Sequence, residues 1–262
     1  MRQLSAAVQG IGLLGPGLED WLAATAVLTG SVPYSPRPAV LPPPAALPAA
    51  ERRRTGAVVR LALAIGFEAV SRAGAKAAEL PTVFSSSGGD GNNCHEICQT
   101  LASDDRQISP TRFHNSVHNA ASGYWSIAAG ATPASNVLCA FDASFGAGLL
   151  EALTQVVVDR TPVLLISYDA GYPEPLHSAR PIPDAFGVAM VLVPDRPEAP
   201  VITASLTDDP PDRLADPRLE LLRTTIPAAR CLPLLARLAR RESGRAVIDY
   251  VDPQRIAIEV ST

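Results

Sequence analysis

The chain has 262 residues, of which 47% are hydrophobic and 18% charged, and its formal net charge is -4. This apolar content is enough for a sizeable core, so we expect an ordinary globular protein and not a disordered chain. The basic residues are scattered along the sequence, which excludes a cationic stripe and makes nucleic acid and anionic membrane surfaces poor partners.

Two further classes are disfavoured by the sequence. The N-terminus has no signal-peptide pattern and no stretch approaches ~18 uninterrupted apolar residues, so we expect no membrane span and a cytoplasmic location. The four cysteines lack the paired spacing of a zinc ribbon and are too few for a disulfide scaffold. We interpret Cys94, Cys98, Cys139 and Cys231 as reduced thiols, and we expect neither a cofactor nor a metal ion.

The first half of the chain opens with an apolar run at 6–14 that ends in GPG, which predicts a buried strand and a turn. Seven prolines between Val32 and Pro48 predict an extended loop. The other elements predicted in this half are helices at 18–29 and 51–74, the latter ending at a glycine cap, a strand at 80–84, and short helices at 94–102 and 120–129.

The second half continues the alternation of strands and helices. Its predicted elements are strands at 136–141, 162–167, 186–193 and 256–260, and helices at 146–158 and 228–241. Such alternation predicts an α/β fold with a mixed or parallel sheet covered by helices on both faces. We expect a domain over 1–195 and a reduced segment over 196–262 that packs on the same core.

Several polar clusters invite a chemical interpretation. The turn SSSGGDG at 85–91 resembles a phosphate loop but lacks its GK[ST] ending, so a plain loop is favoured. His114 and His118 are four residues apart, which makes at most half of a metal site, and a role on a loop or interface is favoured. Cys94, His95 and Cys98 have no second cluster to complete a site.

Ser144 lies between a predicted strand and a predicted helix, where nucleophiles are often placed. The string DASFGAG around it is not the GxSxG elbow of the α/β-hydrolases. A serine hydrolase or acyltransferase that uses Ser144 with His114 or His118 stays open as an alternative function.

Over roughly the first 195 residues, the segments resemble the β-ketoacyl synthases of the thiolase superfamily. The opening AAVQGIGLLGPG is similar to the first strand and turn of that family. The clearest likeness is ISPTRFHNSVHNAASGYWSIAAG at 108–130, in which Asn119, Gly123, Ile127 and Gly130 fall in register with the family's pattern. The resemblance implies the N-terminal half of a thiolase-type fold, with the strand NVLCAF, the turn DASFGAG and the following helix in the place of the nucleophile elbow.

The departures from that family concern its catalytic residues. The synthases carry a cysteine at the elbow, whereas the corresponding stretch Asp142–Gly146 has none, and the equivalent position is expected at Phe145. We therefore interpret Asp142, Ser144, Phe145 and Gly146 as a vestigial elbow with no catalytic residue. The family also needs two histidines and a lysine downstream, but His177 is the one histidine after 118 and no lysine follows Lys76. Condensation by this chain alone is chemically implausible.

The resemblance also implies a partner. A cysteine-less member that lacks the second half of the fold resembles the chain-length factors, which pair with an active ketosynthase, shape its acyl tunnel and meet the acyl carrier protein through that partner. A short form would suit polyketide or fatty-acid-like chains of the aryl polyene type. The expected interface residues are Phe113, His114, Ser116, Asn119, Val137, Leu138, Cys139 and Phe141. A binding module that holds an acyl chain without a partner is a third hypothesis.

Overall fold

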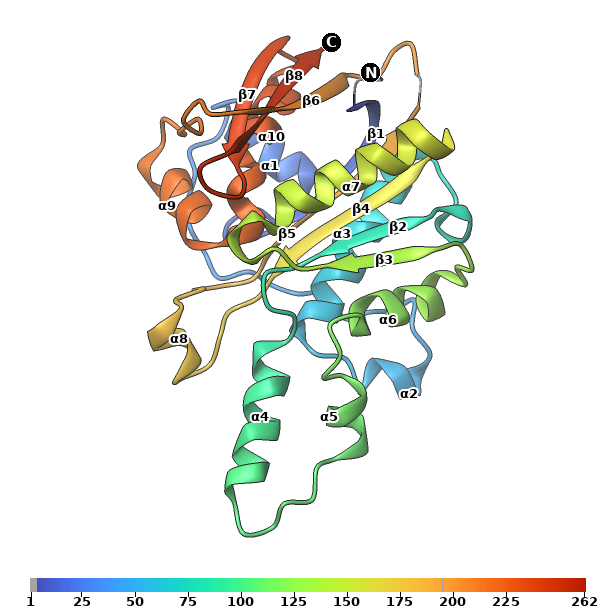
Figure 1. Cartoon of the computed structure of the whole chain (residues 1–262), viewed down its shortest axis with the longest axis vertical. Helices are drawn as coiled ribbons and strands as arrows, with labels where there is room; N and C mark the ends of the chain where they lie inside the picture. Colours follow the sequence, from blue (N-terminus) through green and yellow to red (C-terminus); the bar gives the residue numbers. More distant parts are fainter. Residues whose placement is uncertain (1–3, 195) are drawn as a thin grey trace.

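The computed structural model describes residues 4–194 and 196–262 and has one mixed sheet of eight strands in the order β3-β2-β4-β5-β1-β6-β8-β7 (Figure 1). The strands are β1 (Leu4–Leu14), β2 (Thr82–Ser85), β3 (Ser135–Leu138), β4 (Val163–Asp169), β5 (Phe186–Val193), β6 (Val201–Thr207), β7 (Gly244–Asp249) and β8 (Arg255–Ser261). With helices on both faces, the sheet confirms the predicted fold class.

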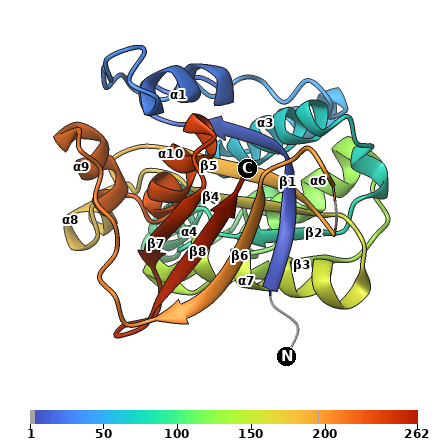
Figure 2. The ribbon, with the colours of Figure 1, turned by 90° about the horizontal axis from the view of Figure 1, so that it is seen from above.

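The sheet changes character along its width. β3, β2 and β4 are parallel to one another, whereas every pairing from β4 through β5, β1, β6 and β8 to β7 is antiparallel. The last three strands of the order come from the C-terminal part of the chain and continue the sheet beyond β1 (Figure 2). The boundary predicted at residue 195 lies outside the described residues.

Ten α-helices and three short 3-10 helices are assigned in the described ranges. The α-helices are α1 (Trp21–Leu28), α2 (Ala49–Arg52), α3 (Ala57–Ala73), α4 (Gly91–Ala102), α5 (Pro110–His114), α6 (Ala120–Ala129), α7 (Ser144–Asp159), α8 (Leu176–Ala179), α9 (Pro217–Thr225) and α10 (Leu232–Arg240). The 3-10 helices are η1 (Ala77–Glu79), η2 (Phe141–Ala143) and η3 (Pro227–Cys231).

One face of the sheet is covered by α3 and α6. The helix α3 lies directly against β1 because two glycines of that strand leave room for it. A Cβ at Gly12 would lie 2.0 Å from the carbonyl oxygen of Ile65, and one at Gly10 would lie 2.4 Å from that of Ala69. The apolar side chains of α3 and the sheet residues that face them form one core cluster.

The opposite face is covered by α7, with α1, α10 and η3 beside it. Leu149, Leu153 and Val156 recur at helical spacing on α7 and are fully buried against the sheet. The stretch Phe141–Asp159 is long and apolar enough to cross a membrane by length and composition, and its buried side chains place α7 among core helices of the same composition.

Several predicted elements need correction. The helix predicted at 51–74 is interrupted between α2 and α3, although it does end at Gly74 in the left-handed conformation (φ 62°). The strand predicted at 136–141 ends at Leu138, so the last part of that range is a turn. The helix predicted at 228–241 begins as η3 and continues as α10. The elements β6, β7, α5 and α9 were not predicted, because short segments with few apolar positions give weak periodicity.

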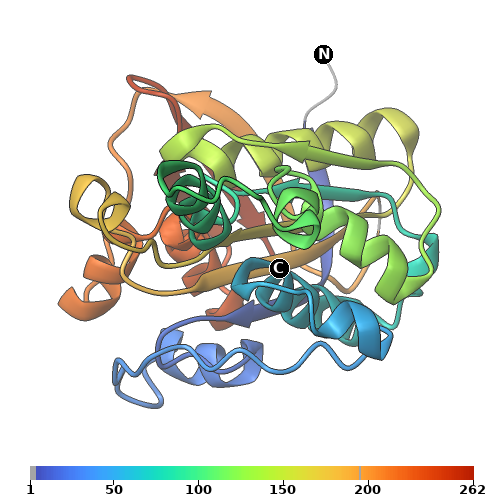
Figure 3. The ribbon, with the colours of Figure 1, turned by 90° about the horizontal axis from the view of Figure 1, so that it is seen from below.

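The helices α4 and α5 form an arm that projects from the body below the carboxyl end of β2 (Figures 1 and 3). Arg112 of α5 pairs with Glu96 of α4 at 3.1 Å and joins the two helices. Both side chains of this ion pair are largely exposed to solvent. An exposed ion pair of this kind contributes little to the stability of the arm.

Candidate functional site

The carboxyl ends of the parallel strands β2, β3 and β4 lie side by side. Ser85, the last residue of β2, is in register with Leu138 of β3 and with Ser167 of β4. The segments that leave these strands therefore gather at one edge of the sheet. In open α/β sheets this is where ligands bind, so we take these segments as the candidate site.

The turn from β3 to α7 contains a strained residue. Phe141 has φ 52°, in the left-handed region that bulky side chains rarely adopt. Arg160 and Arg241 have similar angles, but they are the C-caps of α7 and α10, where that conformation is ordinary. A strained residue between a strand and a helix is the geometry of a nucleophile elbow.

The geometry favours Phe141 over Phe145 as the residue at the elbow position. Phe145 is 1% exposed and its ring lies in the apolar core between α7 and the sheet. Phe141 is 62% exposed and lies one residue before the predicted range Asp142–Gly146. The sequence placed the position too late because it gives no sign of where the backbone turns.

Ser144 is part of the turn. Its hydroxyl donates to the carbonyl oxygen of Phe141 (2.7 Å) and accepts from the amide of Ala140 (3.0 Å), and the residue is 1% exposed. In the described part of the chain neither His114 nor His118 forms a hydrogen bond with it. The arrangement therefore gives no support to a serine nucleophile and accounts for Ser144 as a residue that fixes the turn.

A chain of ion pairs fastens the turn to the C-terminal part. One carboxylate oxygen of Asp142 accepts from Arg180 (2.7 Å) and the other from Arg230 of η3 (2.9 Å). Arg230 also lies 3.9 Å from Asp249 at the end of β7. The guanidinium of Arg180 stacks on the Phe141 ring, 3.6 Å from its centroid.

Asp169, at the end of β4, is the buried carboxylate of the site. It is 3% exposed and accepts from the hydroxyl of Ser86 (3.4 Å), from the amide and hydroxyl of Ser87 (2.8 and 2.6 Å), and from the amide of Ala228 (2.9 Å). Burial raises the pKa of Asp169 to about 6, against the opposing effect of the Ser87 and Ala228 donors and of Arg180. One side chain thus holds together β4, the loop after β2 and η3.

The glycine-rich turn at 85–91 packs closely against the end of β4 and the residues that follow it. The amide of Ser87 donates to Asp169, and that of Gly89 donates to the hydroxyl of Ser86 (3.1 Å). Gly88 lies so close to Tyr172 that a Cβ would be 1.9 Å from the tyrosine hydroxyl oxygen. With these amides directed inward, the geometry agrees with the plain loop and not with a phosphate cradle.

Most of the expected interface residues lie in two patches, whereas Phe141 lies in the turn described above. The first is a groove of about 590 Å³ between α5 and α6, which Phe113, His114 and Asn119 help to line. The sequence did not select Val117 and Ile127, two further apolar residues of the groove, which are 54% and 50% exposed. The spacing of Asn119, Gly123 and Ile127 by four residues could have indicated their shared helix face.

The second patch is the free edge of the sheet. β3 is the outermost strand, with β2 as its neighbour in the sheet order, and its residues Val137 and Leu138 are half-buried. Cys139 follows the strand and is exposed, where the sequence predicted a strand cysteine; its thiol donates to the carbonyl oxygen of Ser87 (3.2 Å). Ser116, also predicted at the interface, is exposed on the arm side.

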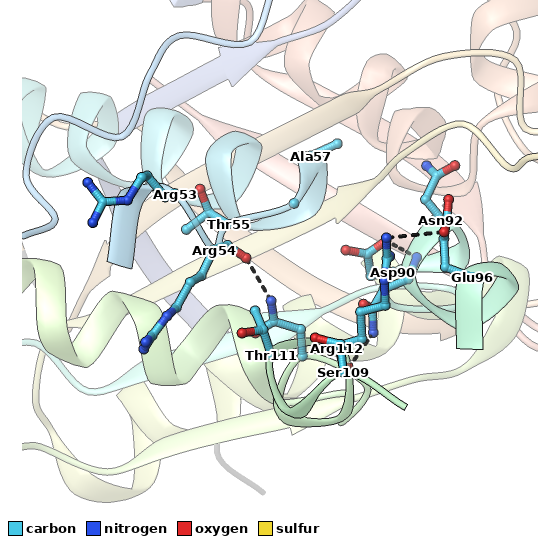
Figure 4. A pocket seen from close by; sticks show the side chains of 13 residues that line it. Arg53, Arg54, Thr55, Ala57, Asp90, Asn92, Glu96, Ser109, Thr111 and Arg112 are labelled. Carbon is cyan, nitrogen blue, oxygen red and sulfur yellow. Dashed lines mark hydrogen bonds and ion pairs between the residues drawn. The ribbon is translucent and has the colours of Figure 1, made fainter. Parts of the chain in front are cut away.

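A polar pocket of about 400 Å³ lies between the start of α3 and the arm (Figure 4). Arg53, Arg54 and Arg112 line it together with Asp90 and Glu96, so its charge is mixed. Two buried amides close its walls: Asn115 donates to the carbonyl oxygen of Arg54 (2.7 Å), and Asn93 to that of Arg112 (2.9 Å). The pocket was not predicted, because its lining comes from three separate segments of the chain.

No group of three or more His, Cys, Asp and Glu side chains within 4–194 and 196–262 is arranged to hold a metal ion. Cys94 and Cys98 lie one turn apart on α4, and burial, with Cys98 beside it, raises the pKa of the Cys94 thiol. His114 lies edge-on to Tyr124, with ring centroids 6.3 Å apart. The two histidines and the two cysteines are thus not brought into one site.

Solved structures with a similar fold include chains of two ketosynthase complexes. A chain of the complex of the ketosynthase ApeO with its chain length factor ApeC from Xenorhabdus doucetiae is 23% identical; the match covers 97% of this chain and 99% of that one, with a TM-score of 0.74. A chain of AntDE:AntF, a type II PKS acyl-carrier protein in complex with its ketosynthase bound to the hexaketide, is 10% identical, with coverages of 100% and 99% and a TM-score of 0.74.

One similar solved structure is a ketosynthase with a much longer chain than this protein. The ketosynthase from module 1 of the bacillaene synthase from Bacillus amyloliquefaciens is 14% identical, and the match covers 81% of this chain but 48% of that one, with a TM-score of 0.58. At such identities the likeness establishes the fold alone. No curated protein matches the sequence.

The family is established by the sequence itself. The model of the β-ketoacyl synthase N-terminal domain matches residues 28–241. The match therefore starts after the opening strand and extends beyond residue 195, where the resemblance was expected to end. The chain belongs to the β-ketoacyl synthase N-terminal domain family.

Proposed function

We propose that the chain is a non-catalytic, chain-length-factor-like subunit that pairs with an active ketosynthase and shapes its acyl tunnel. The observation that carries this proposal is the turn after β3. It has the strained geometry of a nucleophile elbow, but the strained residue is Phe141 and no cysteine lies between residues 140 and 146. An aromatic ring can form no thioester.

The rest of the catalytic set that the family resemblance implies is also missing. Decarboxylation in this family needs two histidines and a lysine from the second half of the fold. Here His177 is the one histidine after residue 118, and no lysine follows Lys76. The carboxylates near the turn are already hydrogen-bonded within the chain. Asp142 binds two arginines, and Asp169, at the end of β4, binds the loop after β2.

The two surface patches support pairing with another subunit. The free edge of β3 offers unpaired backbone groups to a second strand, and the groove between α5 and α6 leaves Phe113, Val117 and Ile127 exposed beside α6. We propose that the ketosynthase covers both patches. The finer features of the function are also proposals: chains of the aryl polyene type, acyl carrier protein met through the partner, and a cytoplasmic location.

Co-expression with a ketosynthase encoded beside this chain tests the function. We expect the two chains to co-elute as a heterodimer that extends malonyl units on acyl carrier protein, and the isolated chain to release no carbon dioxide from malonyl-acyl carrier protein. Because Cys139 is the exposed thiol nearest the turn, the Cys139→Ser variant is the control and should leave the complex active. Carbon dioxide release by the isolated chain that Cys139→Ser abolishes would refute the proposal.

A further inference from the structure

We infer that Phe141 is a specificity-determining residue, whose ring meets the acyl chain held by the ketosynthase and limits how far that chain can extend. The inference rests on the proposed function and adds to it the residue and the ligand. The acyl chain is the occupant to which the geometry points, and the partner protein itself is the competing one.

Burial within the chain does not account for an aromatic residue at position 141. Its left-handed backbone disfavours a bulky side chain, and its ring gains little from burial because it is 62% exposed. A glycine or an asparagine would adopt the same turn with less strain. A strained, exposed aromatic residue is therefore expected to make its contact outside this chain.

The ring is nevertheless held in a fixed orientation. Arg180 stacks on it at 3.6 Å, and Asp142 holds Arg180 at 2.7 Å while Arg230 holds Asp142 at 2.9 Å. The side chains of Arg180 and Arg230 are each 19% exposed, so these contacts are screened less than those of surface ion pairs. A side chain fixed in this way presents a defined apolar surface before any ligand arrives.

The location favours an acyl chain over the partner protein. Phe141 lies at the carboxyl ends of the parallel strands, where an open α/β sheet binds its ligands, and not on the outward face of the arm. It also follows directly on the free β3 edge and Cys139, so a chain that enters between the two subunits there would reach the ring. An alkyl or polyene chain suits an exposed phenyl ring, because burying both removes apolar surface from water.

The test uses the co-expressed complex with three variants of this chain. Phe141→Gly removes the ring and relieves the strain, and Phe141→Leu shortens the side chain while keeping it apolar. Arg160→Gly is the matched control, because it relieves the same kind of strain at the C-cap of α7, on an exposed residue. Products bound to acyl carrier protein are measured by mass spectrometry, together with co-elution and melting temperature of each complex.

We expect both Phe141 variants to give products longer by at least one extension unit, with the larger shift for glycine, and Arg160→Gly to match the wild type. Co-elution should be unchanged. An unchanged length distribution from a folded Phe141→Leu complex overturns the inference, and so does loss of co-elution with unchanged products, which would make the ring a protein contact. If the wild-type chain itself neither co-elutes nor supports extension, the proposed function fails first, and the inference with it.

Discussion

The two edges of the sheet are treated in opposite ways. At one end, the edge strand β7 is covered by charged side chains and by the segment that follows β6. At the other end, β3 has four residues, none of them charged, and no described strand beyond it. A free strand edge invites pairing with another chain, and proteins usually block it where pairing is unwanted.

The β7 edge is blocked by side chains and backbone together. Arg245 pairs with Asp209 (2.6 Å) and lies 3.6 Å from Glu259. Asp212 occupies the outward backbone groups of Val247: its amide donates to the carbonyl oxygen of Val247 (2.9 Å), and its carboxylate accepts from the Val247 amide (3.0 Å). A second strand would therefore find the Val247 groups in the middle of β7 already occupied.

The β3 edge keeps its outward backbone groups. The carbonyl oxygens of Ala134 and Leu138 accept from β2, and because hydrogen bonds alternate along a strand, the amide and carbonyl of Val137 point away from the sheet. The chain thus closes the edge that its own C-terminal part can reach and leaves open the edge where we propose that a partner pairs.

The largest effect on stability is expected from the loss of Arg223, which ties α9 to the β7 end of the sheet. This side chain is 6% exposed and binds both oxygens of Glu220 (2.9 and 2.7 Å) as well as Asp249 of β7. Arg223→Met would leave Glu220 without this counter-ion and Asp249 with only the more distant Arg230, at a cost of about 3–5 kcal/mol. We expect a melting temperature lower by roughly 10 °C, measured by circular dichroism.

The matched control for Arg223 is Arg218→Met on the same helix α9. The Arg218 side chain is 53% exposed and pairs with Asp216, so its loss should change the free energy of unfolding far less than the loss of Arg223 does. Equal melting temperatures for the two variants would show that the buried network does not stabilise the closed end.

A pH-dependent effect is expected from Asp169, which ties η3 to β4. Its pKa in the folded chain is about 6, above the ordinary 3.8, so protonation favours the folded state. The contribution is fully present below pH 3.8 and is lost as the pH rises through 6, a change of about 3 kcal/mol. We expect the free energy of unfolding of the wild type, relative to Asp169→Asn, to fall by most of that amount between pH 4 and pH 7.

Urea denaturation at several pH values measures this difference. The exposed Asp104→Asn is the control and should run parallel to the wild type. A constant difference between the wild type and Asp169→Asn across the range would mean that the buried carboxylate keeps an ordinary pKa.

A smaller effect, on the affinity for the ketosynthase and not on the fold, is expected from a substitution at the β3 edge. Val137→Pro removes one outward amide and no hydrogen bond to β2, so the isolated chain should keep its fold. Pairing with the ketosynthase should weaken on the order of 100-fold, since a partner carbonyl loses its donor and the proline ring obstructs a second strand. Titration calorimetry measures the affinity.

Arg245→Ala, at the opposite edge, is the control for Val137→Pro and should leave the affinity unchanged. Full affinity in the Val137→Pro complex would exclude β3 as the pairing strand. The pair of variants therefore asks directly whether the two edges differ in function.

The sequence alone was sufficient for the fold class and for the residue types that the elbow and the C-terminal part lack. Local periodicity predicts the buried strands β4 and β5 and the long helix α3 with its cap at Gly74. Such a pattern can be recognised without knowledge of the rest of the chain. The absence of a cysteine at 140–146 and of a lysine after Lys76 is likewise a property of composition at given positions.

The tertiary structure decided the points that depend on distant segments. It extended the sheet with β6, β8 and β7, gathered Asp142, Asp169, Arg180 and Arg230 around one turn, and separated an exposed Phe141 from a buried Phe145. Two phenylalanines four residues apart look alike in a sequence. Their difference arises from the backbone angle at the turn and from which side of α7 meets the sheet, and both are set by packing between elements far apart in the chain.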